Sequence, residues 1–186
     1  MTTLKGKGVY GAIALGPVSV FTRKEAAVKR THIDNIPAEK ARLAAAKEKA
    51  IAQLNDIYSK ALREVGEANA QIFEIHIMMI DDEDYNDSIS NIIETQSVNA
   101  EYAVAVTADN FAEMFSSMDD AYMQARAADV KDISNRIISC LSDENSSGGI
   151  SDEKVIICAD DLAPSETVQL DKDRVLAFVT AHGSSN

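Results

Sequence analysis

The sequence lacks tryptophan, and its 186 residues include only two cysteines, three prolines and eight glycines. Two cysteines, Cys140 and Cys158, cannot form a disulfide framework or a four-ligand zinc site. They fit a reducing compartment, so the sequence predicts a cytoplasmic protein. The scarcity of glycine and proline excludes collagen-like and linker-dominated chains. No run of about 18 apolar residues occurs, so we expect no transmembrane helix.

Acidic residues outnumber basic ones, and the excess is unevenly placed. The formal net charge is −12, from 30 Asp and Glu against 18 Lys and Arg, which argues against a general nucleic-acid binder. Residues 1–32 carry a net charge of +5, residues 33–145 carry −13 and residues 146–186 carry −4. From Glu64 to Ala125 there are 14 acidic residues and no Lys or Arg. This span is either a surface that only favours solubility or a docking face for a basic partner.

The middle of the chain has the apolar periodicity of helices. Between Pro37 and Asp143 the sequence contains no proline and only one glycine, Gly66. The pattern predicts one helix from Pro37 to Gly66, a second through residues 72–80, and a continuation over 88–94 beyond the acidic turn 81–84. It also predicts a third helix over 99–117, with Met114 among its inward residues, and a fourth capped by Asp119 or Asp120. We therefore expect four antiparallel helices in a bundle.

Residues 72–80 are apolar on more than one face. A helix of this kind is either deeply buried or leaves part of its surface for a partner.

Strand-like segments flank the helices on both sides. Residues 8–15 and 18–21 predict two short strands around a Gly16-Pro17 turn. Residues 154–159 and 175–180 predict two more, with a short helix that opens at Pro164 between them. Residues 145–149 predict a flexible joint. The expected fold class is α+β with two domains, in which a helical domain (31–145) is inserted into a partial α/β domain (1–30 and 146–186).

Few residues suggest chemistry by themselves. His32 is predicted to lie on a polar surface, and His76, in the middle of a helix, to be a hydrogen-bonded structural residue. His182 follows a strand, and the Gly183-Ser184-Ser185 turn after it either cradles a phosphate or is an ordinary loop. The acidic turn 81–84 lacks the glycine and the twelfth-position glutamate of an EF-hand loop, so no metal site is predicted. The residues alone indicate an acidic helical interaction module.

Three stretches resemble enzyme I, the phosphoenolpyruvate-protein phosphotransferase of bacterial sugar uptake. That family's IFExHIMxLxDxE, DDxYxxxRAADVxDI and ADLTPSETxQL segments are similar to residues 72–84 (IFEIHIMMIDDED), 119–133 (DDAYMQARAADVKDI) and 159–170 (ADDLAPSETVQL). The resemblance is collinear from about Gly8 to the end. It implies a four-helix domain that binds the small phosphocarrier HPr, inserted into an incomplete, swivelling α/β phosphohistidine domain.

The resemblance also implies a phosphotransferase reaction. A histidine of the family takes the phosphoryl group of phosphoenolpyruvate and passes it to HPr, which splits one transfer into two. That histidine follows a Gly-rich turn that residues 182–186 match, so we expect it just after Asn186, with this chain an inactive piece of the whole enzyme. Thr167 matches a supporting Thr, whereas Asn69 stands where the family often has Lys. Phosphoenolpyruvate, Mg²⁺ and homodimerisation are expected through a C-terminal domain, and this chain is expected to bind no cofactor or metal.

For HPr, the resemblance implies a surface on the second helix, the acidic turn and the start of the last helix. Methionine suits such a surface because it adapts to a partner, and the acidic span suits a basic partner face. The implied HPr-binding residues are Glu67, Met78, Met79, Asp82, Glu83, Asp84, Tyr122 and Arg126. Two alternatives stay open: a non-enzymatic acidic helical adaptor, and the phosphohistidine region of a pyruvate phosphate dikinase relative.

Overall fold

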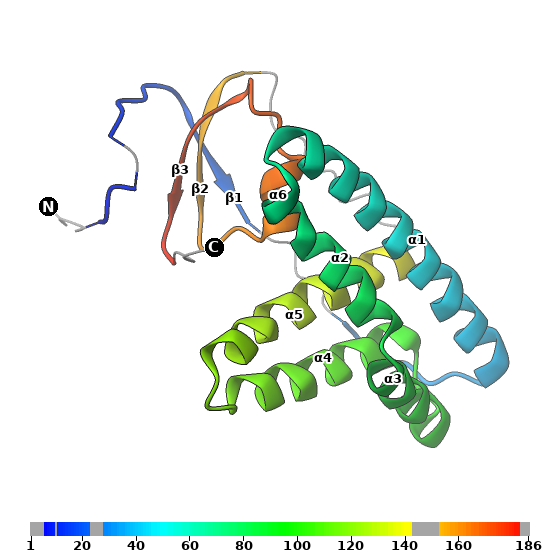
Figure 1. The fold of residues 1–186 in the computed structure, drawn as a ribbon. Helices are drawn as coiled ribbons and strands as arrows, with labels where there is room; N and C mark the ends of the chain where they lie inside the picture. Colours follow the sequence, from blue (N-terminus) through cyan, green and yellow to red (C-terminus); the bar gives the residue numbers. More distant parts are fainter. Residues whose placement is uncertain (1–5, 10, 23–27, 143–152, 183–186) are drawn as a thin grey trace, which may run out of the picture. The chain divides into compact units, whose positions relative to one another are not determined.

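A computed structural model describes residues 6–9, 11–22, 28–142 and 153–182 of the chain (Figure 1). The predicted joint at 145–149 and the glycine-rich turn at 183–186 lie outside these residues. The chain divides into two compact units. The sheet unit takes in Met1–Arg23, Gly149–Leu162 and Leu170–Asn186, and the helical unit takes in Lys24–Gly148 and Ala163–Gln169.

The sheet unit holds three parallel strands drawn from both ends of the sequence. These are β1 (Val18–Phe21), β2 (Val155–Ala159) and β3 (Val175–Thr180), in the order β1-β2-β3. Val18 pairs with Ile156, which in turn pairs with Ala177. The prediction that the two ends of the sequence build one sheet is therefore confirmed.

The strand predicted over residues 8–15 is wrong. The described part of this segment forms no strand, and Val9, Ile13 and Leu15 are exposed. A strand is stabilised by pairing with a neighbour, and among the described residues β1 pairs only with β2. Apolar alternation near Gly8 and Gly11 is thus not enough to form a strand here.

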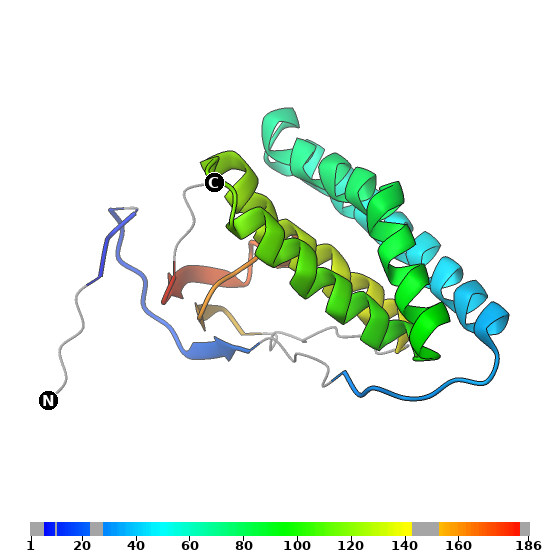
Figure 2. The ribbon, with the colours of Figure 1, turned by 90° about the horizontal axis from the view of Figure 1, so that it is seen from below.

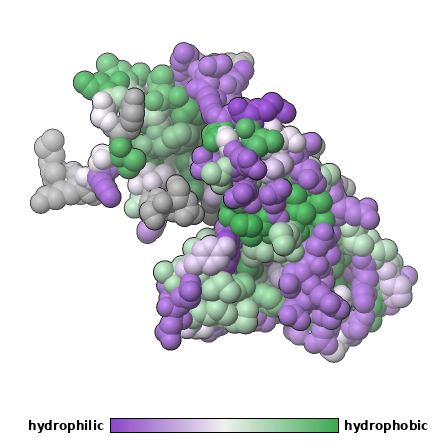
Figure 3. Space-filling view, in the orientation of Figure 1, coloured by the Kyte–Doolittle hydropathy of each residue, from purple (hydrophilic) through white to green (hydrophobic). Residues whose placement is uncertain are grey.

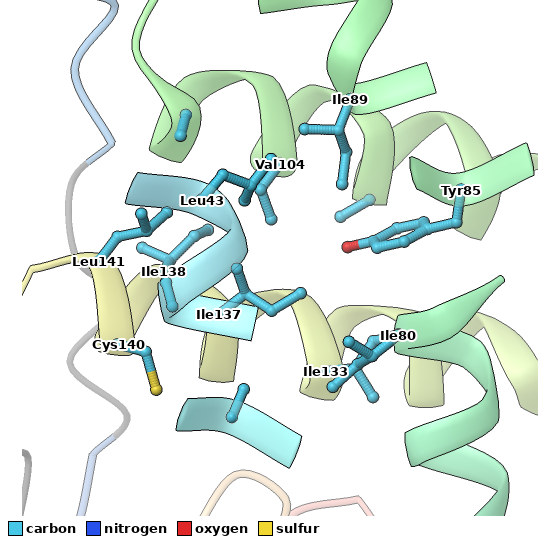
Figure 4. Packing of buried hydrophobic residues seen from close by; sticks show 14 of the residues in the cluster. Leu43, Ile80, Tyr85, Ile89, Val104, Ile133, Ile137, Ile138, Cys140 and Leu141 are labelled. Carbon is cyan, nitrogen blue, oxygen red and sulfur yellow. The ribbon is translucent and has the colours of Figure 1, made fainter. Parts of the chain in front are cut away.

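The helical unit is built from two pairs of long helices. α1 (Ile36–Glu64) lies antiparallel to α2 (Glu67–Asp81), and α4 (Ala100–Ser116) lies antiparallel to α5 (Ala121–Leu141) (Figures 1 and 2). α3 (Glu83–Gln96) follows α2 and packs on α4. Their apolar faces form a single core, into which Tyr85 points from α3 (Figure 4). The Tyr85 hydroxyl is hydrogen-bonded to Ser134 Oγ at 2.7 Å, so this buried polar group has a partner.

Polar side chains set the helix boundaries. Asn35 Oδ1 accepts the Ala38 N–H at the start of α1, and Asp120 Oδ1 accepts the Tyr122 and Met123 N–H groups at the start of α5. Gly66, with φ of +85°, joins α1 to α2 in a conformation that favours glycine. The helix boundaries predicted near Pro37, Gly66 and Asp120 are confirmed.

The prediction of four helices is corrected at Asp82. Its side chain accepts the Tyr85 N–H at 2.9 Å, which starts α3 as a separate helix. A second correction concerns Met114, which is 44 % exposed although it was expected to face inward. It lies beside the buried stripe of α4, whose members are Ala100, Ala103, Val104, Thr107, Ala108 and Ala112.

The short helix α6 (Pro164–Gln169) groups with the helices, although the sequence placed it with the α/β segments. Val168 packs against the helical core, and Ser165 Oγ donates to Asp132 Oδ1 of α5 at 3.1 Å. These contacts attach α6 to the helical unit even though it lies between β2 and β3 in sequence.

Arg42 joins three helices through charged contacts. Its guanidinium donates to Glu39 on α1 and to Glu101 on α4, at 2.6 and 2.7 Å, and to the Leu141 carbonyl of α5 at 3.2 Å. Burial opposes the ionised form of Glu101, but the Arg42 hydrogen bonds outweigh it and lower the pKa of Glu101 to about 2. The Arg42 hydrogen bond likewise lowers the pKa of Glu39. Both carboxylates therefore stay ionised well into acid.

This cluster predicts an acid-sensitive stability. Because both pKa values are lowered on folding, the unfolded state binds more protons below about pH 5, and the stabilisation is lost as the pH falls from there towards 2. At pH 7 we expect Arg42→Met to lower the free energy of unfolding by about 2–4 kcal/mol, because two half-buried carboxylates lose their cation and are left with the Ala100 N–H and the Asn99 amide as donors. Urea unfolding at pH 7 and pH 3 measures both effects. A variant as stable as the parent at pH 7 would contradict the assignment.

Candidate functional site

One stripe of α2 faces outward. Glu67, Gln71, Glu74 and Met78 recur at steps of four and three residues, which places them on one face of the helix, and all four are exposed. Met78 is 71 % exposed, which is a large apolar side chain left in water. Hydrophobic side chains gather over the middle of α2 among hydrophilic neighbours (Figure 3).

A second apolar stripe of α2 is half-buried. Ile72 and Met79 pack against the core, and Ile75 lies between them along the helix. On the face turned towards the core, Phe73 and Ile80 are fully buried. One face of α2 is therefore buried in the core, and another face is exposed and available to a partner.

The acidic turn continues this surface from the end of α2. Asp82, Glu83 and Asp84 are exposed, and Glu83 and Asp84 lie in the first turn of α3. Negative side chains are favourable there because the N-terminal end of a helix dipole is positive. The turn therefore presents carboxylates without loss of helix stability.

Tyr122 and Arg126 lie together near the start of α5. The Arg126 guanidinium carbon lies 4.4 Å from the centre of the Tyr122 ring, and its Nη2 donates to the Tyr122 hydroxyl. Its Nη1 donates to Asp129 Oδ2 at 2.8 Å. Burial opposes the charge on Arg126, but the hydrogen bonds to Tyr122 and Asp129 outweigh it and raise the pKa of Arg126. Arg126 is therefore a fixed positive charge, while Tyr122 is 64 % exposed.

The predicted partner-binding residues lie on α2, at the start of α3 and at the start of α5, and both α3 and α5 contact α2. Met78 to Asp84 form a continuous stretch at the end of α2, and α5, which carries Tyr122 and Arg126, packs against α2. Glu67 lies at the other end of α2, about 16 Å along the axis from Met78. We define the docking surface as all eight of the residues singled out by sequence.

Thr167 lies on α6 and is half-buried. Its Oγ1 donates to the Pro164 carbonyl at 2.9 Å, which leaves the oxygen free to accept a hydrogen bond. His182 is exposed, and its backbone N–H donates to the Asp160 carbonyl at 2.8 Å.

Sequence reasoning missed the surroundings of His76. The imidazole is fully buried, with Nε2 at 3.3 Å from Asp129 Oδ1 and Nδ1 at 3.6 Å from Asp132 Oδ2. Within the described residues neither ring nitrogen has a hydrogen bond of good geometry, so the expected hydrogen-bonded histidine is instead held between two carboxylates. The sequence does contain a signal for this cluster, because Arg126, Asp129 and Asp132 recur every third residue along α5.

The described part of the chain shows no metal site and no membrane span. No group of three or more His, Cys, Asp or Glu among the described residues is arranged to hold a metal ion. Of the described helices, none combines the length and the apolar character that crossing a bilayer requires.

Comparisons with known proteins agree with the resemblance. Residues 5–126 match the family model described as PEP-utilising enzyme, N-terminal, where PEP is phosphoenolpyruvate. The chain is 36 % identical over 181 residues to a phosphoenolpyruvate-protein phosphotransferase of Priestia megaterium, and 37 % identical over 182 residues to that of Geobacillus stearothermophilus. Each alignment covers 97 % of this chain and 32 % of the relative, so the chain spans about a third of their length.

Two solved structures share the fold. A solution structure of enzyme I (nEIt) is 32 % identical, with a TM-score of 0.74, and the match covers 90 % of this chain and 68 % of that one. An N-terminal domain of Enzyme 1-Nitrogen has a TM-score of 0.68 at 22 % identity, which supports the fold alone.

Proposed function

The chain belongs to the PEP-utilising enzyme family as an N-terminal region of enzyme I, and from this premise we propose that its helical unit docks the phosphocarrier HPr. The whole enzyme then moves the phosphoryl group of phosphoenolpyruvate through a phosphohistidine to HPr, in the cytoplasm, for sugar uptake. Within that enzyme, the present chain would provide the surface that recognises HPr.

The observation that carries the proposal is an exposed apolar residue beside a group of carboxylates. Met78 provides a flexible apolar contact, and the carboxylates of Asp82, Glu83 and Asp84 continue from it. A small partner with a basic rim around an apolar centre matches this surface in both charge and polarity. The span from Glu64 to Ala125, which has no Lys or Arg, keeps the surrounding field negative.

Thr167 is proposed to support the phosphorylated histidine. Its Oγ1 already donates to the Pro164 carbonyl, so it can accept a hydrogen bond from an imidazole N–H and fix the ring tautomer. Phosphoenolpyruvate, magnesium and the homodimer contact are proposed for the rest of the full-length enzyme, because this chain aligns with only a third of its relatives.

Titration of the isotope-labelled chain with HPr tests the docking. We expect chemical-shift changes in the NMR spectrum that concentrate on the docking surface, and an affinity that falls by about tenfold or more between low and high salt. Lysozyme, a basic protein of unrelated fold, is the control, and its weak binding should not select these residues. No shift on α2, α3 or α5 with HPr would overturn the proposal.

A further inference from the structure

We propose that His76 is a positioning residue that joins the docking surface to α6 through a continuous line of polar side chains. The line begins at the exposed Tyr122 and ends at the buried Ser165. We call it the His76 line, and its members in order are Tyr122, Arg126, Asp129, His76, Asp132 and Ser165.

Each step of the His76 line is a direct contact. Arg126 stacks on Tyr122 and donates to Asp129 Oδ2 at 2.8 Å. The other oxygen of Asp129 lies 3.3 Å from His76 Nε2, and Nδ1 on the far side of the ring lies 3.6 Å from Asp132 Oδ2. The remaining oxygen of Asp132 accepts the Ser165 hydroxyl at 3.1 Å. Three helices, α5, α2 and α6, are joined in this way.

Burial makes these contacts specific. His76 and Ser165 are 0 % and 1 % exposed, and the side chains of Asp129 and Asp132 are 12 % and 18 % exposed. At such positions water cannot readily replace a lost partner. The carboxylates of Asp129 and Asp132 are therefore held in the geometry that keeps their protein partners close. The ring nitrogens of His76 face these two carboxylates at 3.3 and 3.6 Å, and neither nitrogen has a hydrogen bond of good geometry within the described chain.

The three stretches that carry the resemblance to enzyme I meet in this line. His76 comes from the first stretch, Arg126, Asp129 and Asp132 come from the second, and Ser165 comes from the third. Sequence alone treated them as separate motifs, and the fold joins them through side chains.

The consequence for function rests on the proposed docking of HPr. A partner that contacts Tyr122 or Arg126 changes the hydrogen bond from Arg126 to Asp129. This moves the Asp129 carboxylate relative to His76 Nε2, which it faces. Because the other edge of the imidazole faces Asp132, the change extends to Ser165 and to the helix that carries Thr167. Coupling of this kind acts in both directions, so a change at Ser165 also reaches Arg126.

The test uses the whole chain without any partner. In Arg126→Met we expect shifts of the His76 ring nitrogens and of the Ser165 and Thr167 amides in NMR spectra. In Ser165→Ala we expect the reciprocal shifts of the His76 ring and the Arg126 side chain. The matched control is Lys131→Met on the same helix, because Lys131 pairs with Asp109 at the surface, at 3.9 Å, and lies outside the line. Its effects on the same resonances should be several-fold smaller.

Equal shifts in Arg126→Met and Lys131→Met, or a Ser165→Ala effect that stops at Asp132, would overturn the proposal. Both variants, Arg126→Met and Ser165→Ala, keep His76. The test therefore avoids a substitution of the buried ring that could unfold the protein. A separate HPr titration of Ser165→Ala then tests the functional consequence, with an affinity about 2–10-fold below that of the parent. Reciprocal shifts without HPr binding would leave the line intact and count against the proposed function alone.

Discussion

The paired charge reversal Glu83→Lys and Asp84→Lys is expected to weaken HPr binding by about 100-fold at low salt. Two attractive charges of the docking surface become repulsive, and like-charge juxtaposition across an interface costs several kcal/mol. The loss should shrink at high salt, where screening acts within about 3–10 Å. Isothermal titration calorimetry at two salt concentrations measures both the affinity and its salt dependence.

A matched control separates local docking from total charge. Glu48→Lys with Asp56→Lys changes the net charge equally, from −12 to −8, at two exposed positions of α1 outside the docking surface. We expect this pair to change HPr affinity by less than about threefold at moderate salt, where distant charges are screened. Equal losses in both double variants would show that overall charge, rather than the acidic turn, governs binding.

Circular dichroism is needed beside the calorimetry. Lysine in the first turn of α3 opposes the helix dipole, which costs about 0.3–1 kcal/mol at each position. That cost leaves the helical unit folded, so a loss of helical signal in the reversed variant would contradict the expected docking effect.

Phe73→Ala is expected to destabilise the helical unit by about 3–5 kcal/mol, the usual cost of deleting a buried aromatic ring. The ring is 1 % exposed on the inner face of α2 and meets the His76 ring edge to face, with 6.1 Å between centroids. Its removal leaves a cavity between α2 and the core, and it also removes one wall of the His76 site. Urea unfolding followed by far-ultraviolet circular dichroism gives the change in stability.

Met78→Ala on the same helix provides the comparison. Since Met78 is 71 % exposed, we expect its truncation to change the free energy of unfolding by less than about 0.5 kcal/mol. The same change should weaken HPr binding by about tenfold, which would place Met78 among the minority of interface residues whose truncation costs more than about 1 kcal/mol. Comparable stability losses at the two positions would contradict the division of α2 into a core face and a docking face.

Local rules accounted for most of the fold. The positions of Pro37 and Gly66, the cap at Asp120 and the β-rich segments at both ends are each set by a few neighbouring residues, and these predictions hold. The errors arise where tertiary context decides. The segment over residues 8–15 has strand-like alternation but no strand in its described part, and Asp82 ends a helix that periodicity alone would have continued.

The candidate site shows the same limit. Met78 and the acidic turn are singled out through the resemblance to enzyme I, whereas helical periodicity alone leaves residues 72–80 open between burial and partner binding. The sequence cannot show that His76 lies between Asp129 and Asp132, because that depends on the packing of α2 on α5. Nor does it show that α6 belongs to the helical unit, although β2 and β3 flank it in sequence. Both features are contacts between elements far apart in the chain.

The placement of α6 means that the helical unit is discontinuous in sequence. A polypeptide that ends near Leu141 would include every long helix and still lose the contacts of Val168 and Ser165. Asp132 Oδ1 would then lose the Ser165 donor, and the apolar surface that Val168 covers would be open to water. Whoever excises this unit for study must restore residues 163–169, by a linker or as a separate peptide, to recover its native surface.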